Sequence, residues 1–151
     1  MLGPERRRWL RGVTDPAVHA AYAALVVAPL ARRAGWRPLA AGVAAGTLID
    51  VDHVVAARSV RLNDLWSLGA RPRAHSLLLT TAASGLAWRA AGPRYGWAAF
   101  GGLSSHVLRD ATDGGTPLLW PLSRRDRVPR WVFAGGVAGL LAVSEAIARS
   151  S

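Results

Sequence analysis

The residues best suited to chemistry are histidines and aspartates, and the clearest group lies in the last third of the chain. His106, Asp110 and Asp113 occur at i, i+4 and i+7, directly before a Gly-Gly pair. On an α-helix these side chains share one face, because positions three and four apart are neighbours along it. An imidazole and carboxylates on one face can bind a metal ion, and the same spacing can also serve a structural hydrogen bond.

The other candidates fall at the ends of other apolar segments. We expect helices over residues 16–32, 38–57, 74–91, 95–113 and 129–149. If successive helices are antiparallel, His19, His53, His75 and His106 all lie toward one end of the bundle. An aspartate at the centre of a membrane helix costs roughly 2.5 to 3.5 kcal/mol, so such a cluster needs mutual pairing or a cation. The sequence therefore predicts a His/Asp metal site at that end.

The expected roles follow from residue type and helix position. The predicted metal ligands are His19, Asp50, His53, His75, His106 and Asp110. The other predicted site residues are Asp52 and Asp113, as general base or histidine-orienting groups, and Arg71, Arg73 and Arg109, as phosphate ligands. Asp52 could instead serve a second metal or cap its helix. This ligand set suits one or two zinc ions, and manganese or iron is possible.

A His/Asp metal site points to hydrolysis. A bound metal lowers the pKa of its water, and a second ion can stabilise the leaving oxygen of a phosphoester. The chain has no cysteine, which excludes thiolate ligands and nucleophiles. It also has no GxSxG motif, so a serine hydrolase is not expected.

The segments that carry these residues have the length and composition of membrane helices. The 151 residues suit a single domain, 1–151, with a basic arm over 1–14. Each predicted helix has about 17 to 21 residues, roughly the length that crosses a bilayer core. We therefore predict an all-α, polytopic membrane bundle of about five helices. Asp15 is expected to cap the first helix and Pro16 to begin it.

The net charge of +10 comes entirely from arginines that lie between apolar segments. This distribution favours anionic lipid headgroups as partners over nucleic acid. Twelve arginines fall on one side of the predicted bundle and six on the other, so the positive-inside rule predicts a cytoplasmic N-terminus in a bacterial inner membrane. The apolar run of the first helix is short, which leaves open whether this helix spans the bilayer, lies in the interface or packs within the bundle. His19 interrupts that run, so a signal peptide is not expected.

Four motifs in this order resemble the bacterial YdjM-type family of membrane-bound metal-dependent hydrolases. They are DPAVHAAYAA, GTLIDVDH, RPRAHSLL and SSHVLRDATDGGTPLLWP, and the resemblance covers about residues 15–121. Residues at the family's motif positions are His19, Asp50, Asp52, His53, His75, Ser76, His106 and Asp110. The chain departs from the motifs at Ile49, Ala70 and Ala74, and Ala70 stands where the family usually has a histidine. The HxxxD element is also similar to one in zinc-dependent phospholipase C, which implies phosphoester or phospholipid hydrolysis.

Two other functions remain open from the sequence. One is a non-catalytic membrane protein whose metal or polar cluster is structural, which the alanine at position 70 favours. The other is an ion or proton pathway, which would require polar residues toward the far end of the bundle. The sequence offers few there: Thr80, Thr81, Ser84 and Ser144. The substrate, the metal count and the oligomeric state do not follow from the sequence.

Overall fold

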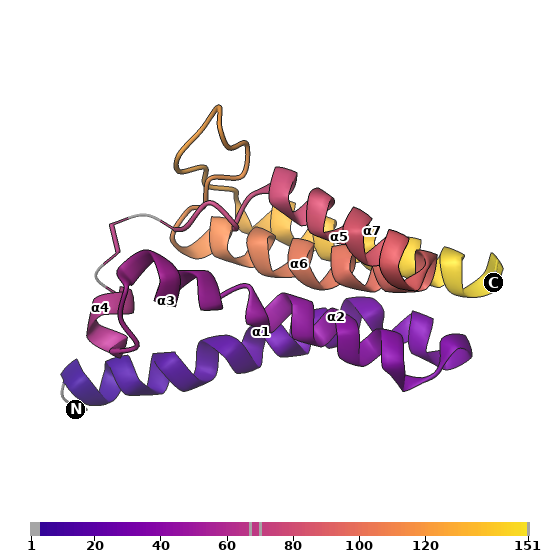
Figure 1. Cartoon of the computed structure of the whole chain (residues 1–151), viewed down its shortest axis with the longest axis horizontal. Helices are drawn as coiled ribbons and strands as arrows, with labels where there is room; N and C mark the ends of the chain where they lie inside the picture. The colour runs from indigo at the N-terminus through magenta and orange to yellow at the C-terminus, as the bar shows by residue number, and fades with distance from the viewer. Residues whose placement is uncertain (1–3, 67, 70, 151) are drawn as a thin grey trace.

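A computed structural model describes residues 4–66, 68–69 and 71–150, and over these residues the fold is all-α, as predicted. The helices are α1 (Pro4–Ala34), α2 (Trp36–Leu48), α3 (Val51–Ala57), α4 (Leu62–Trp66), α5 (Leu77–Ala91), α6 (Pro93–Asp113) and α7 (Arg130–Ser150). The long helices run side by side, and the two termini lie at opposite ends of the bundle (Figure 1). The departure from the family motif at Ala70 concerns a residue outside the described part of the chain.

The first helix differs from the prediction at its start. α1 begins at Pro4, so the expected basic arm is helical, and Pro16 lies inside the helix. Asp15 therefore does not cap a helix, and the predicted start at Pro16 is wrong. The segment before Asp15 contains mainly arginine, leucine and glutamate, which are strong helix formers. Their propensity outweighs the loss of the one backbone hydrogen bond that a proline removes.

The second predicted helix, 38–57, is divided in two. A turn at Ile49 and Asp50 separates α2 from α3, with hydrogen bonds of 3.1 Å from Asp52 N to the Ile49 carbonyl and from His53 N to the Asp50 carbonyl. These bonds span three residues and tighten the chain locally. The short helix α4 was not predicted, because five residues carry too little periodicity.

α6 lies at the centre of the bundle and packs against α1, α2, α5 and α7. At its crossing with α2 the two backbones approach directly at glycines. A Cβ added to Gly102 would lie 2.0 Å from the Gly42 carbonyl oxygen, and one added to Gly46 would lie 2.8 Å from the Gly102 carbonyl oxygen. Glycine is therefore required at this crossing, as small residues are where membrane helices pack closely.

The bundle carries apolar side chains on its outside. Within the described chain, two stretches are long and apolar enough to cross a membrane: Trp36–Ala57 and Arg130–Ser150. Only 11% and 17% of their most apolar windows are buried by the rest of the protein. α5 is polar on its inner face, where Thr80 and Ser84 are buried, and it exposes leucines such as Leu78 and Leu86. Surfaces of this kind fit contact with lipid and not with water.

The first helix packs within the bundle. Val26, Val27 and Leu30 of α1 form the main apolar core together with Ala98 of α6 and Ala148 of α7. This contact supports the interior arrangement that the short apolar run had left open.

Candidate metal centre

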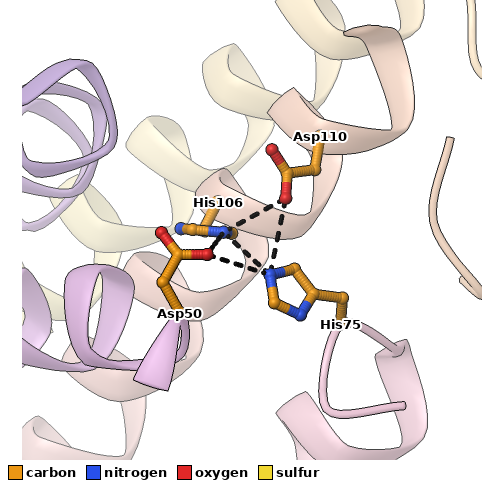
Figure 2. Close-up of side chains that lie close together, drawn as sticks. All are labelled: Asp50, His75, His106 and Asp110. Atoms are coloured by element: carbon orange, nitrogen blue, oxygen red, sulfur yellow. Dashed lines mark hydrogen bonds and ion pairs between the residues drawn. The ribbon is translucent and has the colours of Figure 1, made fainter. Parts of the chain in front are cut away.

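Three separate segments bring four predicted ligands together (Figure 2). Asp50 comes from the turn between α2 and α3, His75 from the loop before α5, and His106 and Asp110 from successive turns of α6. The side chains of His75 and His106 are fully buried and that of Asp110 is 3% exposed, whereas that of Asp50 is 32% exposed. Asp50 is therefore the ligand candidate most accessible from outside the cluster.

The Nε2 atoms of His75 and His106 each lie at the spacing of a tetrahedral metal shell from the other three ligand atoms. His75 Nε2 lies 3.3 Å from Asp50 Oδ1, 3.1 Å from His106 Nε2 and 3.4 Å from Asp110 Oδ2. His106 Nε2 lies 3.4 Å from Asp50 Oδ1 and 3.3 Å from Asp110 Oδ2. For metal–ligand bonds of about 2.0 to 2.1 Å, tetrahedral ligands stand about 3.3 to 3.4 Å apart. These five distances therefore suit a four-coordinate metal ion, and all four ligand atoms lie within 4.8 Å of one another.

A backbone carbonyl orients the imidazole of His106. His106 Nδ1 lies 2.7 Å from the carbonyl oxygen of Gly46, and an Nδ1–H that donates there leaves Nε2 with its lone pair facing the cluster. Gly46 stands in the last turn of α2, where helix carbonyls lack intrahelical donors. The glycine crossing of α2 and α6 brings the two groups within reach.

A carboxylate orients the imidazole of His75 in the same way. His75 Nδ1 lies 3.2 Å from Asp52 Oδ2, so Asp52 accepts its proton and directs Nε2 into the cluster. Burial opposes protonation of His75, but hydrogen bonds with Asp50 and Asp52 outweigh burial and raise the pKa of His75 above its usual value. Two imidazole lone pairs and two carboxylate oxygens therefore face one another, an arrangement that requires a proton or a cation between them.

His19 and His53 contact this cluster from outside the set of four atoms. The ring of His19 stacks on that of His106, with centroids 3.7 Å apart, and its Nε2 lies 3.4 Å from Asp110 Oδ1. His53 Nδ1 lies 3.0 Å from Asp52 Oδ1 and 3.5 Å from Asp50 Oδ1. Asp52, His53 and His75 form a second group with ligand spacing. Because His75 Nε2 already faces the first group, a second ion would have to share its ring.

The other predicted site residues are placed differently. Asp113 pairs with Arg109 one turn away on α6 and lies outside both groups. Arg73 lies over the ring of Trp120, 5.7 Å from its centroid. Arg71 is the arginine that reaches the cluster, with NH1 2.9 Å from Asp110 Oδ2. The ion pair and the stacking contact give Arg109 and Arg73 structural partners at these positions.

A pocket of about 270 Å³ opens beside the cluster. Its polar lining includes Asp15, His19, Asp50, His53, Arg71 and Arg125. Sequence analysis missed Arg125 and Asp15 as pocket residues and Gly46 as the partner of His106. The arginine-rich run after the glycine turn was a signal for Arg125. A backbone carbonyl such as that of Gly46 leaves none, because any residue type supplies one.

Comparison with known proteins agrees with this architecture. The family described as YdjM inner membrane protein matches residues 14–149, which include all four residues of the cluster and most of the chain. No curated protein matches the chain. No solved structure matches it either. With nearly the whole helical bundle covered, the chain belongs to the YdjM inner membrane protein family.

Proposed function

We propose that this protein is a metal-dependent hydrolase of the inner membrane that acts on a phosphoester of a lipid-type substrate. The observation that carries the proposal is the position of the four-atom cluster on the wall of a pocket that also contains an arginine. Asp50 belongs to both the cluster and the pocket lining, so the cluster is reached from the pocket. Arg71, with NH1 2.9 Å from Asp110 Oδ2, also lines that pocket.

Each residue of the site would have a separate role. Asp50, His75, His106 and Asp110 would hold a zinc ion, with manganese or iron as alternatives. When bound, such an ion supplies an activated water at neutral pH and charge stabilisation for a phosphoryl oxygen. Asp52 positions His75, and Arg71 provides a fixed cation for a phosphate group.

The membrane arrangement is part of the same proposal. α1, α2, α5, α6 and α7 would form a multi-pass bundle with a cytoplasmic N-terminus. The loop between α6 and α7 lies at the end of the bundle where the N-terminus is, whereas the α5–α6 turn lies at the end where the C-terminus is (Figure 1). The arginine-rich segments fall at the first end, which the positive-inside rule assigns to the cytoplasm.

A structural metal is the second candidate, and one observation favours it. Four protein ligands at tetrahedral spacing can fill the shell of a zinc ion, as they do in sites that only stabilise a fold. The exposure of Asp50 argues for catalysis, because a ligand that faces a pocket can make room for water. Metal content alone does not distinguish these two functions, but turnover does.

The test measures zinc by mass spectrometry on protein purified in mild detergent and supplied with zinc. We expect about one zinc per chain in the wild type and none in His106→Ala or Asp50→Ala, because each removes a ligand. Asp113→Ala is the matched control, since Asp113 lies on the same helix outside the cluster. Asp52→Asn is expected to weaken zinc binding about 10- to 100-fold, as loss of a histidine-orienting partner does.

The same samples are then assayed against phospholipid and phosphomonoester substrates. Hydrolysis by wild type and Asp113→Ala, and its loss in His106→Ala, would support the proposal. Stoichiometric zinc without hydrolysis of any phosphoester would favour the structural metal. A wild-type protein that binds none of zinc, manganese and iron would overturn both candidates and leave a proton-bridged polar cluster.

A further inference from the structure

The loop between α6 and α7 is a closed, hydrogen-bonded element at the edge of the pocket. Thr116 and Asp126 form an isolated antiparallel bridge, with Thr116 N 3.0 Å from the Asp126 carbonyl and Asp126 N 2.6 Å from the Thr116 carbonyl. The Asp126 carboxylate also accepts from Leu119 N at 3.2 Å and from the Ser123 hydroxyl. These bonds fix the backbone on either side of the bridge, including the residue before Asp126.

That residue, Arg125, is held at the pocket by the Gly114-Gly115 turn. Its Nε donates to the Gly114 carbonyl at 2.9 Å, and its side chain lines the pocket. Gly115 has φ +84°, and a Cβ there would lie 2.9 Å from Arg125 Cγ. A glycine is thus needed both for the turn and for the space that the arginine stem occupies.

Within the described chain, the guanidinium of Arg125 has no carboxylate within 4.0 Å, whereas that of Arg71 pairs with Asp110. Nε is engaged by a carbonyl, so the two terminal nitrogens remain available to donate to an anion. A guanidinium held by its own loop loses little side-chain freedom on binding, which favours bidentate recognition of phosphate.

The remaining pocket wall is apolar. Leu65 of α4 and Leu68 line it together with Pro16. The volume of about 270 Å³ is near the lower limit for small-molecule sites. It suits a headgroup and the first carbons of a chain, while the rest of a lipid would extend into the membrane. Asp15 also lines the pocket, and its carboxylate would disfavour an anion placed on the α1 side.

We propose that this pocket binds the phosphate-bearing headgroup of a lipid, with Arg125 and Arg71 on the phosphate and Leu65 and Leu68 against the adjoining carbons. This inference deepens the proposed function, on which it rests for the fate of the bound lipid. It adds Arg125 as the phosphate ligand that the sequence did not identify.

Binding is measured by native mass spectrometry on the full chain, both metal-free and zinc-loaded. The probes are dihexanoylphosphatidic acid and inorganic phosphate. The variants are Arg125→Gln and, as the matched control, Arg124→Gln, because Arg124 is an exposed neighbour outside the pocket lining. In either metal state we expect Arg125→Gln to weaken phosphatidic acid binding about tenfold or more, because it removes a charged hydrogen-bond partner. Arg124→Gln should leave this binding unchanged.

The probes separate the sources of the phosphate. Wild-type protein should bind phosphatidic acid more tightly than inorganic phosphate, because only the lipid contacts the apolar wall. Equal affinities would overturn the lipid assignment in favour of free phosphate, and equal behaviour of the two arginine variants would overturn the role of Arg125. Phosphatidic acid that binds through Arg125 without any hydrolysis by the zinc-loaded protein would leave the binding site intact and contradict the proposed hydrolase. Hydrolysis together with binding that does not depend on Arg125 would support the proposed hydrolase and contradict the role of Arg125.

Discussion

The helices α6 and α7 have the same length but differ in how much of each is buried by the rest of the protein. Each has 21 residues. α6 buries twelve of them, including His106 and Asp110, whereas α7 buries only Ser144 and Ala148. Only α7 is apolar enough to qualify as a membrane span. The more polar helix is thus inside and the more apolar helix outside.

This inversion indicates which solvent surrounds the bundle. In water, the apolar helix would be buried and the polar one exposed. In lipid, an apolar exterior is free of cost, and polar side chains gather where they find partners. Two of the four candidate ligands, His106 and Asp110, lie on the helix that is covered on most sides, a position that keeps them away from lipid.

The strongest way to break this comparison is a charge on the outer face of α7. Ala138 is exposed near the middle of the helix, and Ala138→Asp should cost about 2.5 to 3.5 kcal/mol if that face meets the bilayer core. On a water-exposed surface the same change would alter stability by no more than about 0.5 kcal/mol. The measurement is the fraction of protein that remains in the membrane after an alkaline wash.

Leu122→Asp is the control for that experiment, because Leu122 is 90% exposed in the α6–α7 loop and outside the helices. We expect it to remain in the membrane fraction. Full membrane retention of Ala138→Asp would show that this face of α7 is not in contact with lipid.

A smaller difference in stability is expected when one methyl group is added to a glycine of α6 or of α7. Gly102→Ala in α6 places a Cβ 2.0 Å from the Gly42 carbonyl oxygen, whereas Gly139→Ala in α7 meets nothing within 4 Å. We expect Gly102→Ala to lower the free energy of unfolding by about 1 to 3 kcal/mol, because α2 and α6 must move apart. Gly139→Ala should raise stability by up to about 1 kcal/mol through helix propensity.

The readout is thermal unfolding in detergent, followed by zinc binding at a temperature where both variants are folded. Separation of α2 from α6 would also draw the Gly46 carbonyl away from His106, so zinc affinity should fall in Gly102→Ala alone. Equal stability and equal zinc affinity in the two variants would contradict the close crossing.

Helix number and the gathering of His and Asp at one end could be read from the sequence, because both depend on helical period and alternating direction. Which of these side chains contact one another could not be predicted from the sequence. His19 and His106 both fall at the predicted end, but their stacking depends on the crossing of α1 and α6. Gly135 and Gly139 of α7 form a GxxxG pattern, but a Cβ built at either position meets nothing within 4 Å, so the pattern marks no close contact within the described chain. The division of 38–57 at Asp50 depends on a turn whose dihedral angles remain nearly helical.

The roles of the arginines were also beyond the sequence. Arg71 and Arg73 flank the same proline, yet Arg71 contacts the cluster and Arg73 lies over the ring of Trp120. Loop geometry decides between these partners, whereas the pair of Arg109 with Asp113 follows from their i,i+4 spacing on a helix. Arg125 is placed by contacts with Gly114 across the loop.

The smallest predicted effect concerns Thr80, which α5 turns toward α6. Thr80 is 1% exposed, and its hydroxyl makes no hydrogen bond. Ser84, one turn later, donates its hydroxyl to the Thr80 carbonyl at 2.7 Å. Thr80→Val keeps the shape and removes a buried polar group without a partner, so stability should be unchanged or rise by up to about 1 kcal/mol. Ser84→Ala, which loses this hydrogen bond within α5, should cost about 0.5 kcal/mol.

Both variants are compared by thermal unfolding, with zinc binding as a second readout that neither should alter. A proton pathway through the bundle would make the Thr80 hydroxyl necessary, and its removal would then impair function without impairing stability. Unchanged zinc binding and phosphoester hydrolysis in Thr80→Val would instead assign the polar residues of α5 to close helix packing. The functional polar groups would then be confined to the end of the bundle where α6 carries His106 and Asp110.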